Sequence, residues 1–182
     1  MVAVIPVKSL AQAKSRLGTV LDADVRHDLA LTLLARTIAA CREAGLEPCV
    51  VSPDPIVHAA ARAQGAATLD DGGAGLTGAV ALALAAHAHV REIVVVAADL
   101  PEITAQALLE LLAAADPLAL VAAEDGTTNA VAARPPGAFT PSYGPGSAAR
   151  HGGAHVRIAA LERDLDTPDD LWRALDDGVA CR

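Results

Sequence analysis

Three basic side chains lie close together near the start of the sequence, where an apolar run ends. Lys8, Lys14 and Arg16 belong to VKSLAQAKSRL, which begins at the end of VAVIPV (2–7), a run of buried-strand length. Cations and backbone N–H groups at the end of a strand can hold a polyphosphate. The stretch has no Gly-Lys-Ser/Thr and no glycine framework, so it is not a P-loop and side chains would have to hold the phosphates. A solvated basic loop is the alternative that this stretch leaves open.

One carboxylate follows the strongest strand signal of the chain. In EIVVVAADLP, Asp99 comes shortly after four branched apolar residues in a row. Magnesium prefers oxygen ligands, and a carboxylate at the carboxyl edge of a parallel sheet can hold it beside substrate phosphates. The alternative is an aspartate that caps the following turn. Ala97 and Ala98 leave room for a ligand beside Asp99, which favours the metal role.

A second acidic segment, DLDTPDDL, combines a helix start with two further carboxylates. Thr167 with Asp170 three residues later forms a capping-box-like beginning of a helix. Asp164 and Asp166 precede this cap and are not explained by it. Alternate residues of an extended segment point to the same side, so the pair could face a site. Asp166 is the better candidate for a second metal ligand, and a solvated acidic pair is the alternative.

A polar turn between two apolar runs supplies hydrogen-bonding side chains. In EDGTTNA an Asp-Gly pair makes the turn. Thr127, Thr128 and Asn129 then give three polar side chains where one would suffice. We therefore predict that they bind part of a substrate.

The stretch FTPSYGPGSAARH contains the only Phe and the only Tyr of the chain. Gly144 and Gly146 would let the backbone approach a ligand, and Ser147 is predicted to cap a short helix that ends near Arg150. A helix N-terminus and an arginine favour anions, so we favour an anion site over a rigid connection between two elements. His151 receives no role.

Strand and helix signals alternate along the chain, and the strand segments are uniformly apolar. This pattern is typical of an α/β fold with a mainly parallel sheet and helices on both faces, in which ligands bind beyond the carboxyl ends of the strands. The expected strands are 2–7, 48–52, 92–99, 118–124 and 129–133, with a brief one at AATLD. The expected helices are 23–45, 55–65, an Ala-rich segment that runs to about His89, 104–115 and 166–175.

Composition limits the possible partners. A chain of 182 residues is predicted to form one domain, 1–182. The net charge of −8 and only 2% aromatic residues argue against a nucleic-acid groove. No apolar stretch reaches the roughly 18 residues that a membrane span needs, so we expect an untargeted cytoplasmic protein. Cys41, Cys49 and Cys181 lack metal or redox spacing and are expected to be reduced, buried thiols.

Five segments of the chain together resemble the CofC/FbiD family: VIPVKSLAQAKSRL, ADLP, DGTTNA, FTPSYGPGSAARH and DLDTPDDL. They occur in the family's order and span nearly the whole chain. This family comprises the phosphoenolpyruvate or 2-phospho-L-lactate guanylyltransferases of deazaflavin (coenzyme F-420) biosynthesis. GPGS after the DGTTN turn is the most specific part. The resemblance implies the Rossmann-like nucleotidyltransferase fold. It also implies GMP transfer from GTP to a small phosphorylated carboxylic acid, with passage of the product to the next enzyme of the pathway.

The resemblance also implies roles for individual residues. GTP phosphates would face Lys8, Lys14 and Arg16. Mg²⁺ would be held by Asp99 and Asp166. The acceptor would be bound by Thr128, Gly144 and Ser147, with Thr127, Asn129, Gly146 and Arg150 nearby.

One departure from the family pattern concerns the segment GLTGAV. The family usually has Gly-Leu-Asn-x-Ala there, and Thr77 replaces the Asn, which puts a guanine or ribose contact in doubt. From the resemblance and the Ala- and Arg-rich composition we expect phosphoenolpyruvate as the preferred acceptor, with 2-phospho-L-lactate or 3-phosphoglycerate as alternatives. A nucleotidyltransferase for a molybdenum cofactor or a sugar phosphate, and a non-enzymatic nucleotide-binding scaffold, are the other readings. The sequence decides neither the number of metal ions nor the oligomeric state.

Overall fold

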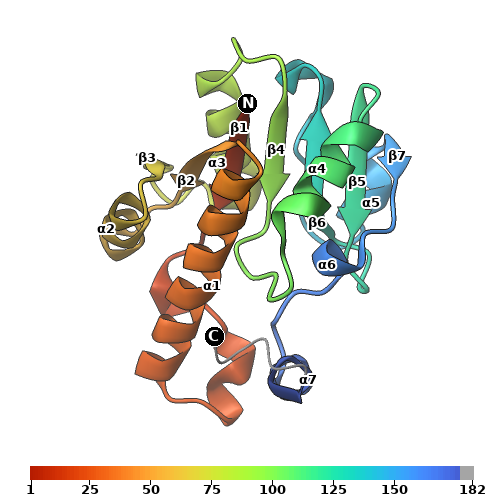
Figure 1. Cartoon of the computed structure of the whole chain (residues 1–182). Helices are drawn as coiled ribbons and strands as arrows, with labels where there is room; N and C mark the ends of the chain where they lie inside the picture. Colours follow the sequence, from red (N-terminus) through yellow and green to blue (C-terminus); the bar gives the residue numbers. More distant parts are fainter. Residues whose placement is uncertain (177–182) are drawn as a thin grey trace.

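The computed structural model describes residues 1–176 and is built around one mixed sheet (Figure 1). Its strand order is β3-β2-β1-β4-β6-β5-β7. Only β6 runs antiparallel to its neighbours within the described chain, and every other pairing is parallel. The strands are β1 (Val2–Pro6), β2 (Glu47–Val51), β3 (Ala67–Leu69), β4 (Ile93–Val96), β5 (Leu118–Ala122), β6 (Thr128–Ala133) and β7 (Ala154–His155).

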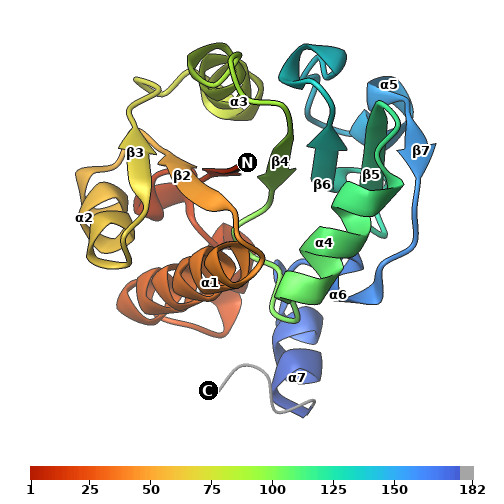
Figure 2. The ribbon, with the colours of Figure 1, turned by 45° about the horizontal axis from the view of Figure 1, so that its top comes forward.

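Helices cover both faces of this sheet (Figure 2). They are α1 (Ala23–Glu43), α2 (Pro55–Ala63), α3 (Gly75–Ala86), α4 (Ala105–Ala114), α5 (Ser147–His151), α6 (Ala159–Glu162) and α7 (Pro168–Asp176). Three short 3₁₀ segments complete the described chain: η1 (Leu10–Gln12), η2 (Ser15–Thr19) and η3 (Pro136–Ala138). The mainly parallel α/β sheet predicted from the alternating signals is confirmed.

Alternating strand residues feed two hydrophobic cores, one on each face. Ile5 and Val96 pack with α1, α2 and α4 on one face. Val4 and Val95 pack with α3 and the segment around Phe139 on the other. Because β1 and β4 are buried on both faces, they read as continuous apolar runs rather than as alternating ones.

A third, smaller cluster lies beyond the carboxyl edge of the sheet. Leu165, just before α7, and Leu171, within α7, pack against Leu17 of η2 and Leu33 of α1. Burying these side chains ties the last described helix to the loop that follows β1. In Figure 1, α7 accordingly lies at the bottom of the molecule, beside the red-orange segment that follows β1.

Local signals explain where the helices begin and end. Thr104 accepts a hydrogen bond from Ala107 N and is the N-cap of α4, as predicted. Gly45, with φ of 74°, follows α1 in the left-handed conformation that favours glycine. The structure finds Cys41 and Cys49 buried and free, as predicted, whereas Cys181 lies outside the described residues. No described helix is both long enough and apolar enough to cross a membrane.

Candidate active site

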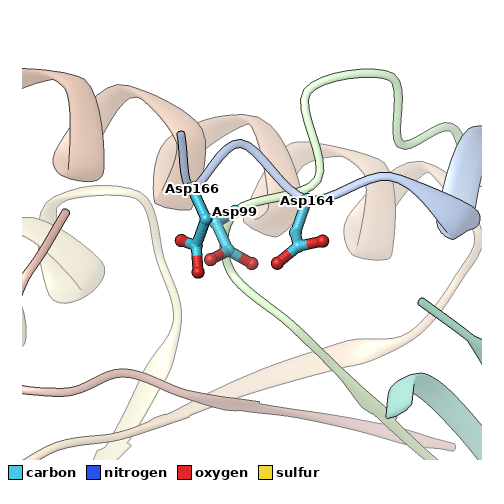
Figure 3. Close-up of side chains that lie close together, drawn as sticks. All are labelled: Asp99, Asp164 and Asp166. Atoms are coloured by element: carbon cyan, nitrogen blue, oxygen red, sulfur yellow. The ribbon is translucent and has the colours of Figure 1, made fainter. Parts of the chain in front are cut away.

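Three carboxylates converge beyond the carboxyl end of β4 (Figure 3). Asp99, Asp164 and Asp166 each place a carboxylate oxygen so that the three atoms lie within 4.8 Å of one another. Asp99 comes from the loop after β4, and the other two come from the segment that precedes α7. A group of three oxygen ligands is suited to a hard divalent cation.

The extended segment 164–166 explains why its two acidic residues share one side. Leu165 N donates a hydrogen bond to Asp99 O over 3.0 Å, which fixes the segment beside the loop after β4. The Leu165 side chain is fully buried in the third cluster. Its neighbours on either side therefore point the other way, toward Asp99, as alternation along an extended chain requires.

Lys14 joins two of these carboxylates. Its Nζ lies 2.6 Å from Asp99 Oδ2 and 3.0 Å from Asp166 Oδ1, and only 6% of its side chain is exposed. Burial alone would lower the pKa of Lys14, but the two neighbouring carboxylates outweigh it and raise this pKa above its ordinary value. The sequence placed Lys14 toward nucleotide phosphates, and the structure places its ammonium among the acidic residues.

Lys14 is also the only non-glycine residue with a positive φ, 52°, in the described chain. A lysine in this conformation is strained by the contact of its Cβ with the backbone. Such strain at the centre of a charged cluster supports a functional role for the position.

Asp164 is the ligand candidate that the sequence left in second place. It is half-buried beside two other carboxylates, and no described side chain forms an ion pair with it. Burial, followed by repulsion from Asp99 and Asp166, raises the pKa of Asp164 to about 6. The usable signal was the alternation in DLD, which puts both aspartates on the same side.

Lys8 and Arg16 are both exposed in the loop after β1, and Arg16 lies at the edge of the same site. Arg16 Nη1 lies 3.9 Å from Asp166 Oδ2, with 70% of its side chain exposed, so this pair is loose and solvent-screened. Lys8 has no described partner. Both cations remain available to an anionic ligand, and their predicted contact with phosphates stays a prediction.

Asp54 is a positioning residue to which the sequence gave no role. It is the N-cap of α2, and its Oδ1 accepts from Ile56 N. Its Oδ2 accepts from Leu10 N over 2.9 Å. Burial would raise the pKa of Asp54, but the backbone N–H groups that point at its carboxylate lower it. One side chain thus caps a helix and holds the loop that carries Lys14.

The β5–β6 turn is organised by Asp125, as the Asp-Gly pair predicted. Asp125 Oδ1 accepts from both the backbone N and the hydroxyl of Thr127, at 2.9 and 2.6 Å. Gly126 has φ of 78°, as this turn requires. Thr127 is therefore engaged in the turn itself.

β6 begins at Thr128, one residue before the predicted strand 129–133, and both Thr128 and Asn129 are buried. Asn129 Nδ2 donates to Leu161 O, which attaches α6 to the sheet. Thr128 Oγ1 lies 3.1 Å from Ser147 Oγ and 3.0 Å from His151 Nδ1. Their predicted contact with a substrate stays a prediction.

The prediction that Ser147 caps the short helix is wrong. The N-cap of α5 is Gly146, in the left-handed conformation, and no side chain caps this end. Ser147 is the first helical residue and fully buried. Its hydroxyl is drawn inward by the partner hydroxyl of Thr128, because a buried hydroxyl needs a hydrogen-bond partner.

The GPGS loop is tied down by Arg150. Its guanidinium donates to Pro145 O at 2.5 Å, Ser142 O at 2.9 Å and Ser142 Oγ at 3.2 Å. The first two N–H groups of α5 are also used, because Ser147 N and Ala148 N donate to Gly144 O and Gly126 O. In this conformation the stretch is a rigid connection between two elements. The anion site stays a prediction, and an anion there would have to be bound by N–H and O–H groups that these contacts do not use.

Thr77, the departure from the family pattern, has a structural contact of its own. Its Oγ1 accepts from Tyr143 N over 3.1 Å and so joins the start of α3 to the GPGS loop.

The capping box before α7 is confirmed, because Thr167 N donates to Asp170 Oδ2 and Asp170 N to Thr167 Oγ1. Asp169 is exposed and belongs to the first turn of α7.

Comparison with known proteins identifies the family. The sequence model of the guanylyl transferases described as CofC-like matches residues 1–166. A Rubrobacter xylanophilus protein named phosphoenolpyruvate guanylyltransferase is 44% identical over 188 residues, covering 94% of this chain and 91% of that protein. A Sphaerobacter thermophilus protein of the same name is 38% identical, with 93% and 90% coverage. The chain belongs to the CofC-like guanylyl transferase family.

Solved structures show the same fold outside this family. 2-C-methyl-D-erythritol 4-phosphate cytidylyltransferase from Thermus thermophilus superposes with a TM-score of 0.61 at 18% identity, covering 98% of both chains. CMP:2-keto-3-deoxy-manno-octonic acid synthetase, solved with CTP, gives 0.64 at 17% identity, covering 97% of this chain and 98% of that one. The predicted family and Rossmann-like nucleotidyltransferase fold are confirmed, and this CofC-like chain is a nucleotidyltransferase.

Proposed function

We propose that this chain transfers GMP from GTP to phosphoenolpyruvate, forming enolpyruvoyl-2-diphospho-5′-guanosine and pyrophosphate for deazaflavin coenzyme biosynthesis. The choice of acceptor is supported by the relatives of 44% and 38% identity, both named for this reaction. The observation that carries the proposal is the Asp99–Asp164–Asp166 cluster, bridged by Lys14 at the carboxyl edge of the sheet. The product would then pass to the next enzyme of the pathway.

The acidic cluster fits a magnesium ion. Its members offer only carboxylate oxygens, which are the ligands that Mg²⁺ prefers. Lys14 contacts one oxygen of Asp99 and one of Asp166, so the other oxygens and both of Asp164 are left for a metal. When bound, Mg²⁺ would neutralise charge on the transferred phosphoryl group. Asp99, Asp164 and Asp166 would hold it.

The chain's own cations would stabilise the rest of the charge. Arg16 lies beside the cluster, Lys8 is exposed in the same loop after β1, and both would face the β- and γ-phosphates of GTP. Lys14, held at the centre, would keep Asp99 and Asp166 in place and meet the α-phosphate. Positioning and fixed charge of this kind account for most catalysis of phosphoryl transfer.

The reaction needs no general base from the protein. The acceptor's phosphate oxygen would attack the α-phosphorus of GTP, the bond to the β-phosphate oxygen would break, and pyrophosphate would leave. A phosphate monoester is mostly dianionic at neutral pH, because its second pKa is about 6. The attacking oxygen therefore carries no proton to remove.

Pyrophosphate release from GTP with a panel of acceptors tests the proposal. Magnesium-dependent release with phosphoenolpyruvate, at a higher kcat/KM than with 2-phospho-L-lactate or 3-phosphoglycerate, is the expected result. A preference for another acceptor or for ATP would revise the substrate pair. Release with a sugar phosphate or a molybdopterin alone would place the chain beside other nucleotidyltransferases, and no release with any acceptor would favour a nucleotide-binding scaffold.

A further inference from the structure

Three buried polar side chains form a chain of hydrogen bonds behind the GPGS loop. Thr128 of β6, Ser147 and His151 of α5 are exposed by only 8%, 0% and 8%. Thr128 Oγ1 is the centre of the group, at 3.1 Å from Ser147 Oγ and 3.0 Å from His151 Nδ1. All three side chains are buried, so water does not exchange with these hydrogen bonds. The direction of each bond therefore depends on which of the atoms carry protons.

A backbone group decides which ring nitrogen of His151 carries the proton. Ser142 N lies 2.9 Å from His151 Nε2. A backbone N–H can only donate, so Nε2 must accept and carries no proton in this arrangement. The neutral imidazole then has its proton on Nδ1, which donates to Thr128 Oγ1.

Aromatic contacts hold the ring in this orientation. Phe139 and Tyr143 each meet His151 edge-on, with ring centroids 4.9 Å away. Burial, and then the positive charge of Arg150, lower the pKa of His151 below its ordinary value. The neutral ring is therefore the form present at neutral pH. The lone Phe and Tyr of the chain both serve this purpose.

The proton count leaves one hydroxyl hydrogen unassigned. His151 donates to Thr128, so it cannot accept from it. The Thr128 and Ser147 hydroxyls have two protons, and their mutual hydrogen bond uses one. Apart from each other and His151, neither hydroxyl has a hydrogen-bond partner among the described residues. Thr128 retains a little exposure at the carboxyl edge of the sheet, where an external acceptor atom could be reached.

We propose that His151 is a positioning residue for the acceptor substrate: its Nδ1–H keeps one hydroxyl proton of the Thr128–Ser147 pair free to donate to an oxyanion of that substrate. This inference rests on the proposed function, because it names the residue that prepares the acceptor site. With the opposite tautomer, His151 would take this proton and the pair would offer the substrate only lone pairs. A phosphate or carboxylate would then be repelled rather than bound.

Two substitutions separate the two nitrogen atoms of His151. His151→Asn places an amide near the position of Nδ1, where it can still donate to Thr128, but loses the acceptor of Ser142 N. His151→Gln places an amide oxygen near Nε2, where it can still accept from Ser142 N, but loses the donor to Thr128. We expect KM for phosphoenolpyruvate to rise severalfold in His151→Gln and clearly less in His151→Asn, because only His151→Gln leaves Thr128 Oγ1 without the donor that fixes the direction of its hydroxyl proton.

The readouts distinguish positioning from general structural support. KM for GTP should stay within about twofold in both variants, and His155→Gln, at an exposed position on β7, should change neither KM. A similar rise of the phosphoenolpyruvate KM in both variants, or an equal rise of the GTP KM, would show that His151 only supports the fold. Thermal unfolding of each variant identifies any that are misfolded.

Nitrogen-resolved NMR of the wild-type imidazole tests the same inference without turnover. The expected spectrum has a protonated Nδ1 and an unprotonated Nε2 for His151, and the reverse would overturn the inference. If wild-type protein shows this tautomer but turns over no phosphorylated carboxylic acid, the proposed function fails, and with it the acceptor role of His151. Turnover with a doubly protonated or Nε2–H ring would contradict the inference and leave the proposed function intact.

Discussion

At the scale of single residues, Asp164 is where function and stability conflict. Its raised pKa means that the folded protein resists its negative charge. We expect Asp164→Asn to increase the free energy of unfolding at neutral pH by about 1 kcal/mol in the presence of a chelator, a modest value because partial exposure lets solvent screen the repulsion. The same change should lower kcat by roughly tenfold or more, because an amide is a poorer metal ligand.

Chemical denaturation and pyrophosphate release measure both effects on one sample. Asp169→Asn is the matched control, because Asp169 is exposed in the first turn of α7. The Asp169→Asn variant should lose less than about 1 kcal/mol of unfolding free energy, through the helix dipole, and keep its activity. A less stable Asp164→Asn would show that the carboxylate is compensated in the folded state.

Lys14 should be needed for folding as well as for catalysis. Lys14→Met leaves Asp99 and Asp166 facing each other without their shared cation. We expect a loss of about 1–3 kcal/mol in unfolding free energy at neutral pH, with kcat reduced by roughly 100-fold. Lys8→Met, at an exposed position, should leave stability unchanged, and equal unfolding curves for the two variants would contradict the bridging role.

The sequence indicated Lys14, Asp99 and Asp166 as separate site candidates, but it could not show that they bond to one another. Asp99 and Asp166 follow Lys14 by 85 and 152 residues in the chain, and only the fold brings the three side chains together. The same limit explains the error at Ser147 and the contacts of Arg150 that the sequence did not show. A local pattern predicts a cap or an anion site, whereas a distant hydroxyl and nearby carbonyl groups had already engaged these side chains.

At the scale of elements, the loop after β1 depends on the cap of α2. Asp54→Ala removes both the N-cap of α2 and the acceptor for Leu10 N. We expect a loss of about 1–2 kcal/mol in stability and a severalfold rise of KM for GTP, because the loop that carries Lys14 loses its anchor. Thr104→Ala is the control: it removes the comparable cap of α4 and should lower stability without changing that KM. Equal KM effects would remove the tethering role.

Element types followed from the sequence because the local signals agree with the fold. β1 and β4 are continuous apolar runs since both of their faces are buried, and α4 begins at the cap that the sequence predicted. The antiparallel direction of β6 and the membership of Thr128 in it were not accessible, because they depend on pairing with β4 and β5. The 3₁₀ segments η1 and η2 were read as a loop, since they carry no helical periodicity.

At the scale of the whole molecule, the site exists because distant segments meet at one edge of the sheet. The loop after β1, the loop after β4, the β5–β6 turn and the segment before α7 all contribute. Leu165 and Leu171 bury against Leu17 and so hold the last of these segments in place. Hydrophobic packing outside the main core therefore positions two of the three carboxylates.

The pH dependence of stability should reveal two opposing groups in this assembly. His151 has a lowered pKa, so the unfolded state takes up a proton first and stability is lost as pH falls below its ordinary value of 6.5. Asp164 has a pKa raised to about 6 from 3.8, so the folded state takes up a proton first and stability is regained over that interval.

Unfolding free energies in chelator between pH 7.5 and about 4 would measure both. The excess stability of Asp164→Asn over wild type should shrink as pH falls from about 6 toward 4, whereas His151→Asn should lose less stability than wild type between pH 7 and 5. A difference between Asp164→Asn and wild type that does not change with pH would mean that charge repulsion is not its cause.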